Sequence, residues 1–225
     1  MLPSVSSLKQ ITFVFGCIMA LTLLAAFSAS ADWIAKGRQL SWQMQVPGDW
    51  FGGSYDQIRN VMEMPETRRY RHFFESFLSL AKDCDAKLWH YPDLQSFANE
   101  PSSFTTSTIT AIRVEVGPSF GAIEFTAADM KYFFQVFADG MRNKAPPAAS
   151  VTSLETKSFF VDNRSAYETT FRIDRPKQGR YYVVLVLVPL RDGALHQFTL
   201  DVDSSRFPAR RGEFRSMLRT LRYPK

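Results

Sequence analysis

Hydrophobic and polar residues follow strand-like patterns in the first half of the chain. From Leu40 to Val46 alternate positions are apolar, and the run stops at Pro47-Gly48, so a strand followed by a turn is predicted. The β-branched residues from Thr105 to Val116 predict a longer strand. Ala86 to Tyr91 predicts a short strand between these two.

The second half of the chain has the pattern of four successive strands. They are Val151 to Phe160, Arg164 to Ile173, Tyr181 to Leu190 and Leu195 to Val202. Because the turn-like spacers between them are short, antiparallel hairpins are predicted, and Asp192-Gly193 is the strongest hairpin signal. Tyr182 to Val188 lacks alternation, so both faces of this strand are expected to be covered.

Apolar residues at helical spacing recur in three segments. After a break at Gly52-Gly53, a helix is predicted over Pro65 to Lys82. A second helix is predicted over Thr126 to Arg142, where Thr126 and Asp129 form an acidic variant of the capping box. The last runs from about Arg210 to Arg222, with an apolar stripe of Phe214, Met217, Leu218 and Leu221. A mainly antiparallel β-sheet covered by two to three amphipathic helices is an α+β fold.

The first 31 residues have the organisation of an export signal. Lys9 supplies the single charge of the opening segment, and Ile11 to Phe27 is an almost unbroken apolar run. Small residues follow, with Ala29 and Ala31 at the A-x-A positions that a signal peptidase requires. We therefore predict cleavage between Ala31 and Asp32, export from the cytoplasm, and a periplasmic location.

Two other fates of this segment compete with cleavage. Residues 11–27 approach the length of a spanning helix, so a retained inner-membrane anchor is the alternative. Cys17 would be the modified residue in lipoprotein processing, but bulky Phe15 stands where a lipobox requires a small residue. Because Asp32 directly follows the small-residue site, cleavage is favoured. Membrane contact is then transient and made through the signal segment only.

Composition limits what the mature chain can be. Its phenylalanine content, 20 in the whole chain, excludes the disordered class. Residues 32–225 are long enough for one domain with a substantial core, so we predict a single exported α+β domain. Cys84 is the one cysteine left after cleavage, so no intramolecular disulfide forms and the core must hold the fold together.

Positive charge is concentrated at the C-terminus. The formal net charge is +5, whereas residues 206–225 alone contain six arginines, one lysine and one acid. Four arginines recur along the last predicted helix, beside its apolar stripe: Arg211, Arg215, Arg219 and Arg222. If the apolar stripe packs on the sheet, these guanidinium groups point outward and can bind anionic lipid, an anionic polymer or an acidic envelope protein. A solvated face, whose arginines favour the helix C-terminus, is the alternative. Nucleic acid is not expected as a partner of an exported protein.

The sequence contains no recognisable catalytic, metal or cofactor motif. Cys84 and His90 are the one Cys–His pair close in sequence, but the acids beside Cys84 would raise the pKa of the thiol and oppose catalysis. Asp201 and Asp203 share one side of a strand end and could hold Ca²⁺ weakly, yet they lack the further oxygens of an EF-hand loop. The histidines are scattered, without zinc spacing: His72, His90 and His196. We therefore predict no catalytic residue, metal or cofactor.

Three features in combination resemble the PsbP-like family. The first strand ends in Gln45-Val46-Pro47-Gly48-Asp49-Trp50, a later meander contains Asp192-Gly193, and the closing helix carries Phe207, Phe214, Met217, Leu218 and Leu221. The resemblance covers residues 38–222, with an extra helix near 66–82 inserted after the first strand. It implies an α/β/α sandwich and an extracytoplasmic, non-enzymatic role, as in photosystem accessory subunits and bacterial envelope proteins. No site motif of the family matches, so no functional residue carries over.

These observations lead to one leading hypothesis and two alternatives. The leading hypothesis is an exported, non-enzymatic binding or assembly protein of the cell envelope, which acts through a surface and without a cofactor. The first alternative is an exported enzyme with a dispersed site that uses Cys84. The second is recruitment to an anionic surface through the arginine-rich C-terminal helix.

Overall fold

Nine strands and four α-helices make up the described part of the chain. The computed structural model describes residues 32–39, 41–93, 106–116, 125–144, 149–175 and 179–224. The strands are β1 (Trp33–Lys36), β2 (Gln43–Val46), β3 (Trp50–Gly53), β4 (Ala86–His90), β5 (Thr108–Val114), β6 (Ser150–Val161), β7 (Arg164–Arg175), β8 (Gly179–Pro189) and β9 (Leu195–Asp203). The helices are α2 (Tyr55–Glu63), the 3₁₀-helix η1 (Pro65–Tyr70), α3 (Arg71–Ala81), α5 (Ala127–Lys144) and α6 (Phe207–Thr220).

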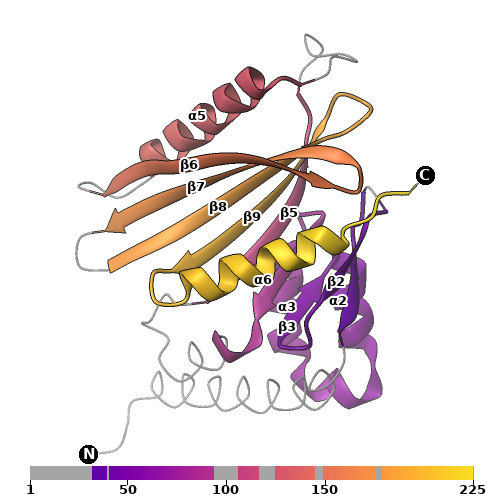
Figure 1. Cartoon of the computed structure of the whole chain (residues 1–225). Helices are drawn as coiled ribbons and strands as arrows, with labels where there is room; N and C mark the ends of the chain where they lie inside the picture. The colour runs from indigo at the N-terminus through magenta and orange to yellow at the C-terminus, as the bar shows by residue number, and fades with distance from the viewer. Residues whose placement is uncertain are drawn as a thin grey trace, which may run out of the picture.

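Seven of the strands form one antiparallel sheet in the order β3-β4-β5-β9-β8-β7-β6. β1 and β2 form a separate antiparallel pair. Figure 1 shows α5 on one face of the large sheet and α6 on the opposite face. The predicted α+β class, with an antiparallel sheet covered by helices on both faces, is confirmed.

Each face of the sheet has its own hydrophobic core. Under α6, the predicted apolar stripe of Phe214, Met217, Leu218 and Leu221 is buried against β8, β9 and the β1–β2 pair. Under α5, Met130 and Phe134 pack against Phe171 and Leu185. Every residue from Val183 to Val188 in β8 is buried, because successive side chains enter opposite cores. The prediction that both faces of this strand are covered is confirmed.

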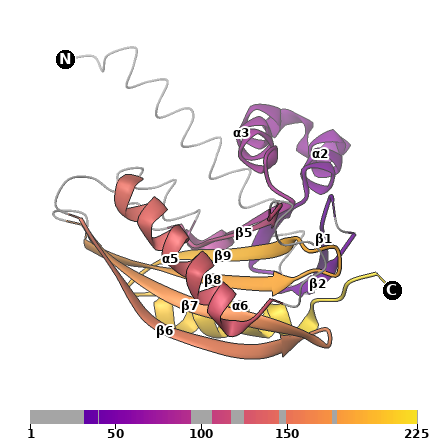
Figure 2. The same cartoon turned by 90° about the horizontal axis from the view of Figure 1, so that it is seen from above.

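A third core lies beside the β3–β4 edge, beneath α2 and α3. Phe51 and Trp89 come from neighbouring strands and contact Phe77 edge-on or nearly so, with ring centroids 5.3 and 4.7 Å away. Ile58 of α2 and Phe74 of α3 complete the cluster. Figure 2 shows the two helices together at this end of the molecule, away from α5.

The elements predicted around the β3–β4 edge need correction. Gly52-Gly53 is not a break between elements but the end of β3. Gly52 has φ +132°, and a Cβ there would meet a backbone oxygen of β4 at 2.1 Å, so glycine is required by the close pairing of β3 with β4. The single helix predicted over Pro65 to Lys82 is a 3₁₀-helix followed by α3. β1, β3 and α2 were not predicted.

Several predictions fall on residues outside the described ranges. These are the signal segment, residues 1–31, with its alternative anchor over residues 11–27, and most of the Pro-rich link before β6. Within the described ranges, no helix is long and apolar enough to cross a membrane.

Candidate functional site

The four arginines of the C-terminal segment do not share one exposed face. Arg211 donates from Nη2 to Glu168 Oε1 at 2.6 Å, and Arg215 donates from Nε to Oε2 at 2.8 Å and from Nη2 to Oε1 at 2.7 Å. Glu168 lies on β7 and is only 1% exposed. The prediction that these guanidinium groups point outward is therefore wrong for Arg211 and Arg215, because a buried carboxylate beneath α6 draws both toward the sheet.

The charge of Glu168 is stabilised by this pairing. Burial by itself would raise the pKa of Glu168, but hydrogen bonds from Arg215 and Arg211 and their positive charges outweigh it and hold the pKa below its ordinary value. In return, the hydrogen bond to Glu168 raises the pKa of Arg215. The carboxylate thus fastens α6 to β7 as a charged group.

The remaining two arginines have different environments. Arg222 donates from Nη1 to the carbonyl oxygens of Arg219 at 3.1 Å and Leu221 at 2.7 Å, so it caps the end of α6. Arg219 is exposed, and no ion pair to it is found among the described residues. Of the four predicted residues, Arg219 has the guanidinium group most available to a ligand.

Arg219 and Arg215 line a cleft of about 270 Å³ between α6 and β6. The residues around it are Lys157, Ser158, Phe159, Phe160, Arg215 and Arg219. We call it the basic cleft. Phe160 is 75% exposed, the most exposed large hydrophobic residue described. Lys157 pairs with Glu155 at 2.9 Å, and Arg211 approaches Glu155 at 3.9 Å.

The cleft keeps an excess of positive charge after its ion pairs are counted. Four cations, the lysine and three of the arginines, face two carboxylates, Glu155 and Glu168. The local net charge is therefore +2. Guanidinium groups with aromatic rings beside them suit a ligand that carries an acidic group on an apolar body.

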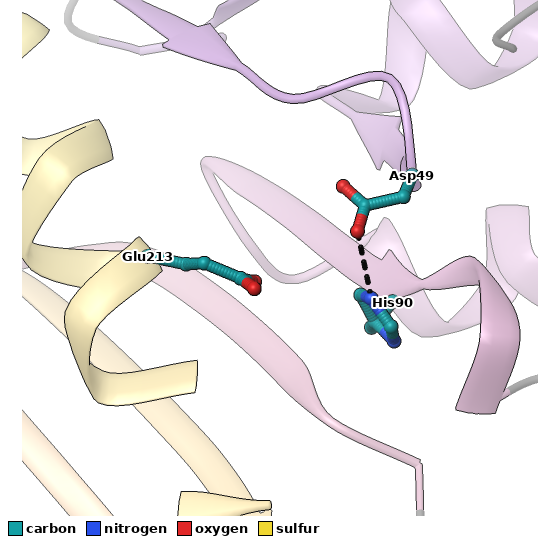
Figure 3. A group of neighbouring side chains, drawn as sticks. All are labelled: Asp49, His90 and Glu213. Carbon is teal, nitrogen blue, oxygen red and sulfur yellow. Dashed lines mark hydrogen bonds and ion pairs between the residues drawn. The ribbon is translucent and has the colours of Figure 1, made fainter. Parts of the chain in front are cut away.

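A second group of polar side chains surrounds His90, the last residue of β4 (Figure 3). Its Nε2 lies 3.0 Å from Asp49 Oδ2, in the turn before β3. Strand pairing places Trp50 opposite His90 and so brings Asp49 alongside. Glu213 reaches in from α6, and ligand atoms of Asp49, His90 and Glu213 all lie within 4.8 Å of one another. We call these three residues the His90 cluster.

Further ion pairs surround the cluster. Arg210 Nη1 contacts both oxygens of Glu213, at 2.5 and 2.6 Å. On the other side of the imidazole, His90 Nδ1 lies 3.3 Å from Asp93 Oδ1. Burial opposes the charge of Asp93, but interactions with His90 and Ser107 outweigh it and lower the pKa of Asp93.

The other sequence candidates have structural surroundings. Cys84 Sγ lies 3.7 Å from the carbonyl oxygen of Leu80, and burial together with the neighbouring acids raises the pKa of its thiol. No hydrogen bond joins Cys84 to His90 among the described residues. A nucleophilic thiol needs a lowered pKa, so this environment does not favour catalysis by Cys84.

His196 is fully buried on β9, with Nδ1 2.8 Å from the hydroxyl of Tyr223. Burial lowers the pKa of His196 to about 3, which keeps the ring neutral. Asp203 accepts the backbone N–H groups of Ser205 at 2.8 Å and Arg206 at 3.2 Å, so it stabilises the turn into α6. Asp201 and Asp203 belong to no group of three metal-donor side chains in the described ranges. The side chain of His72 lies outside what the structure describes.

Sequence reasoning missed both Glu168 and the His90 cluster. Glu168 lies 43 and 47 residues from its two arginines, and Asp49 lies 41 residues from His90. The sequence shows only that Glu168 is a single acid within a predicted strand, and its burial beside Thr169 and Thr170 is seen in the structure alone. A charged residue at such a position requires a partner.

Comparisons with known proteins support the fold. The structure of cyanobacterial PsbP from Synechocystis sp. PCC 6803 matches with a TM-score of 0.55 and 10% identity, covering 86% of this chain and 93% of that one. LpqN of Mycobacterium tuberculosis, described as involved in cell envelope biogenesis, matches with a TM-score of 0.47 and 13% identity, over 86% and 91% of the two chains. No protein-family model and no curated protein matches by sequence. The match to cyanobacterial PsbP shows that the chain has a PsbP-like fold, as its sequence pattern predicted.

Proposed function

We propose that this protein is an exported, non-enzymatic binding or assembly protein of the cell envelope, and that it contacts anionic phospholipid headgroups through the basic cleft. The observation that carries the proposal is the gathering of Lys157, Arg215 and Arg219 around one cleft at the edge strand β6. Phe160, 75% exposed, lies on the same edge strand, but strand alternation directs its ring to the opposite sheet face from Lys157. Cations that neutralise headgroup phosphates, next to an aromatic ring that enters the interface, are typical of surfaces that dock on anionic membranes.

Two further features of the sequence support this proposal: the signal-like segment and the distribution of positive charge. The signal-like segment before Asp32 favours a compartment in which lipid headgroups are accessible anions. The positive charge is local, since residues 206–225 carry more net charge than the whole chain. An acidic envelope protein would offer the same carboxylate or phosphate chemistry, but the projecting aromatic ring favours lipid as the partner.

The test is co-sedimentation of the purified protein with phosphatidylglycerol-containing vesicles and with neutral phosphatidylcholine vesicles. Each cation near the surface contributes about 1 kcal/mol, so the double variant Lys157→Gln/Arg219→Gln should lose about 30-fold in affinity. The matched control is Lys131→Gln/Arg142→Gln, which removes the same charge from exposed positions on α5, across the sheet.

Phe160→Ser tests the apolar part of the contact against Tyr132→Ser, which removes a 61% exposed ring on α5. We expect a loss of roughly tenfold for Phe160→Ser and little change for the control. Equal binding to neutral vesicles, or equal losses in the cleft and control variants, would reject the lipid proposal. Binding only to an acidic protein captured by crosslinking from the envelope would assign the cleft to that partner instead.

A further inference from the structure

The His90 cluster has a donor set that the proposed function does not use. Asp49 comes from the turn before β3, His90 from the end of β4 and Glu213 from α6, and Figure 3 shows both carboxylates directed toward the imidazole. Three elements distant in sequence thus present one nitrogen and two carboxylate groups at one point. We propose that Asp49, His90 and Glu213 bind a divalent transition-metal ion, with Zn²⁺ as the representative ion.

The mixture of donors indicates the class of ion. Imidazole nitrogen with carboxylate oxygen suits Zn²⁺ and related transition metals, whereas Mg²⁺ and Ca²⁺ favour oxygen ligands alone. Three protein donors leave a fourth position for water. The Asp49 side chain is 45% exposed and gives the ion a path from solvent, while His90 is buried at 1%.

A buried carboxylate supports the imidazole from behind. His90 Nδ1 lies 3.3 Å from Asp93 Oδ1, an ion-pair contact that does not meet hydrogen-bond geometry. Asp93, only 2% exposed, accepts the backbone N–H of Ser107 at 3.0 Å. Arg206 Nε pairs with the same carboxylate at 3.1 Å. Metal-binding histidines characteristically direct the second ring nitrogen at such a carboxylate, which fixes the ring and leaves the other nitrogen for the ion.

Arg210 competes with an ion for Glu213. It contacts both carboxylate oxygens, and Trp50 Nε1 also donates to Oε2 at 3.2 Å. A carboxylate has lone pairs enough to serve a metal with one oxygen and a hydrogen-bond donor with the other. The positive charge of Arg210 nonetheless repels a cation, so we expect the native site to be moderate in affinity.

Binding also requires the contact between His90 and Asp49 to rearrange. His90 Nε2 and Asp49 Oδ2, 3.0 Å apart, must separate so that the Nε2 lone pair and a carboxylate oxygen can both bond the ion. No electron transfer is involved.

The experiment is calorimetric titration of untagged, chelator-treated protein with Zn²⁺, alongside the visible absorption of bound Co²⁺. We expect one ion per chain, with affinity at least about tenfold weaker in Asp49→Asn and Glu213→Gln. Asp56→Asn, an exposed acid on α2, is the matched control and should bind as the native protein does. His90→Gln should abolish the nitrogen contribution to the Co²⁺ spectrum.

Arg210→Met supplies the sharpest contrast, because it is expected to tighten binding by removing the competing cation. An adventitious surface ion would not respond in opposite directions to Arg210→Met and Glu213→Gln. Thermal unfolding without metal checks that each variant folds. If His90→Gln does not fold, Asp49→Asn, at a part-exposed position, still tests the proposal. A protein that binds no ion stoichiometrically, or equal affinity in Asp49→Asn and Asp56→Asn, overturns the proposal. Neither result bears on vesicle binding by the basic cleft.

Discussion

Replacing Glu168 with glutamine tests whether a buried carboxylate fastens α6 to the sheet. In the native protein Glu168 accepts four hydrogen bonds from Arg211 and Arg215. Glutamine has nearly the same shape but no charge, and its one carbonyl oxygen cannot satisfy both guanidinium groups. The substitution therefore removes the charge while leaving the packing of β7 largely unchanged.

The expected loss in the free energy of unfolding depends on how exposed Arg211 and Arg215 are. Breaking a fully buried ion pair costs about 3–5 kcal/mol, because the remaining charge is left without compensation. Here the side chains of Arg211 and Arg215 are 21% and 36% exposed, so water can solvate them once the carboxylate is lost. We therefore expect Glu168→Gln to lower the free energy of unfolding by about 2 kcal/mol at neutral pH, below the fully buried value.

The loss should depend on pH in a defined direction. The arginines hold the pKa of Glu168 below its unfolded value, so its stabilising contribution is complete above the unfolded pKa. That contribution disappears as the pH falls through the lowered, folded pKa. The difference between native and variant should thus be largest at neutral pH and shrink in acid.

Urea unfolding followed by tryptophan fluorescence measures this difference at neutral and acidic pH. The control is Glu155→Gln, whose carboxylate is half exposed and 3.9 Å from Arg211, and a loss below about 0.5 kcal/mol is expected there. If Glu168→Gln is no less stable than Glu155→Gln at neutral pH, or its loss persists unchanged in acid, the assignment is wrong.

Three further predictions concern other parts of the chain. Asp201 keeps some accessible surface, but desolvation of its carboxyl raises its pKa to about 6, so its contribution to stability is lost as the pH rises through that value. Asp201→Asn should therefore be more stable by about 2 kcal/mol in urea unfolding at pH above 7, and no gain would contradict the raised pKa. Gly52→Ala should lower the Tm strongly, through φ +132° and a 2.1 Å clash, whereas Gly140→Ala on α5, with open space around it, should raise it slightly. A mature N-terminus at Asp32 is expected by N-terminal sequencing of the exported protein, and Ala31→Arg should block that processing; the same mature end in both proteins would contradict the assigned site.

Long periodic segments were predictable from sequence because burial on a sheet or helix leaves a repeating pattern. The stripe of Phe214, Met217, Leu218 and Leu221 identified α6, and Thr126 with Asp129 identified the start of α5, where the Thr126 hydroxyl accepts the N–H of Asp129 at 3.3 Å. The unbroken apolar run of β8 correctly indicated two covered faces.

Short elements were missed because four residues carry too little periodicity to be recognised. β1 and β3 have four residues each, and β3 contains two glycines that resemble a turn. α2 had a usable signal, since Ser54 and Gln57 form a capping box in the structure. These capping residues directly follow Gly52-Gly53, and the glycine pair was interpreted as a break between elements, so the helix start was not predicted.

The candidate sites depend on contacts that no local pattern contains. Sequence placed Arg211, Arg215 and Arg219 correctly on one helix, but α6 ends at Thr220, so Arg222 lies beyond it and bridges to Gln43 of β2. Sequence also could not distinguish the arginines that pair with the sheet from the one that remains available. The difference is decided by Glu168 on β7, a strand separated from α6 by β8 and β9 along the chain. The His90 cluster likewise exists only after β3, β4 and α6 meet.

The most direct test of the lipid-binding proposal places a fluorescent reporter at Phe160. The purified Phe160→Trp variant is mixed with phosphatidylglycerol vesicles that contain brominated acyl chains, and Tyr132→Trp on α5 serves as the matched exposed reporter on another element. The account predicts that bromine quenches the tryptophan at residue 160 and leaves the one at residue 132 unchanged, with no quenching in neutral vesicles. Equal quenching at both positions, or none at residue 160, would contradict it.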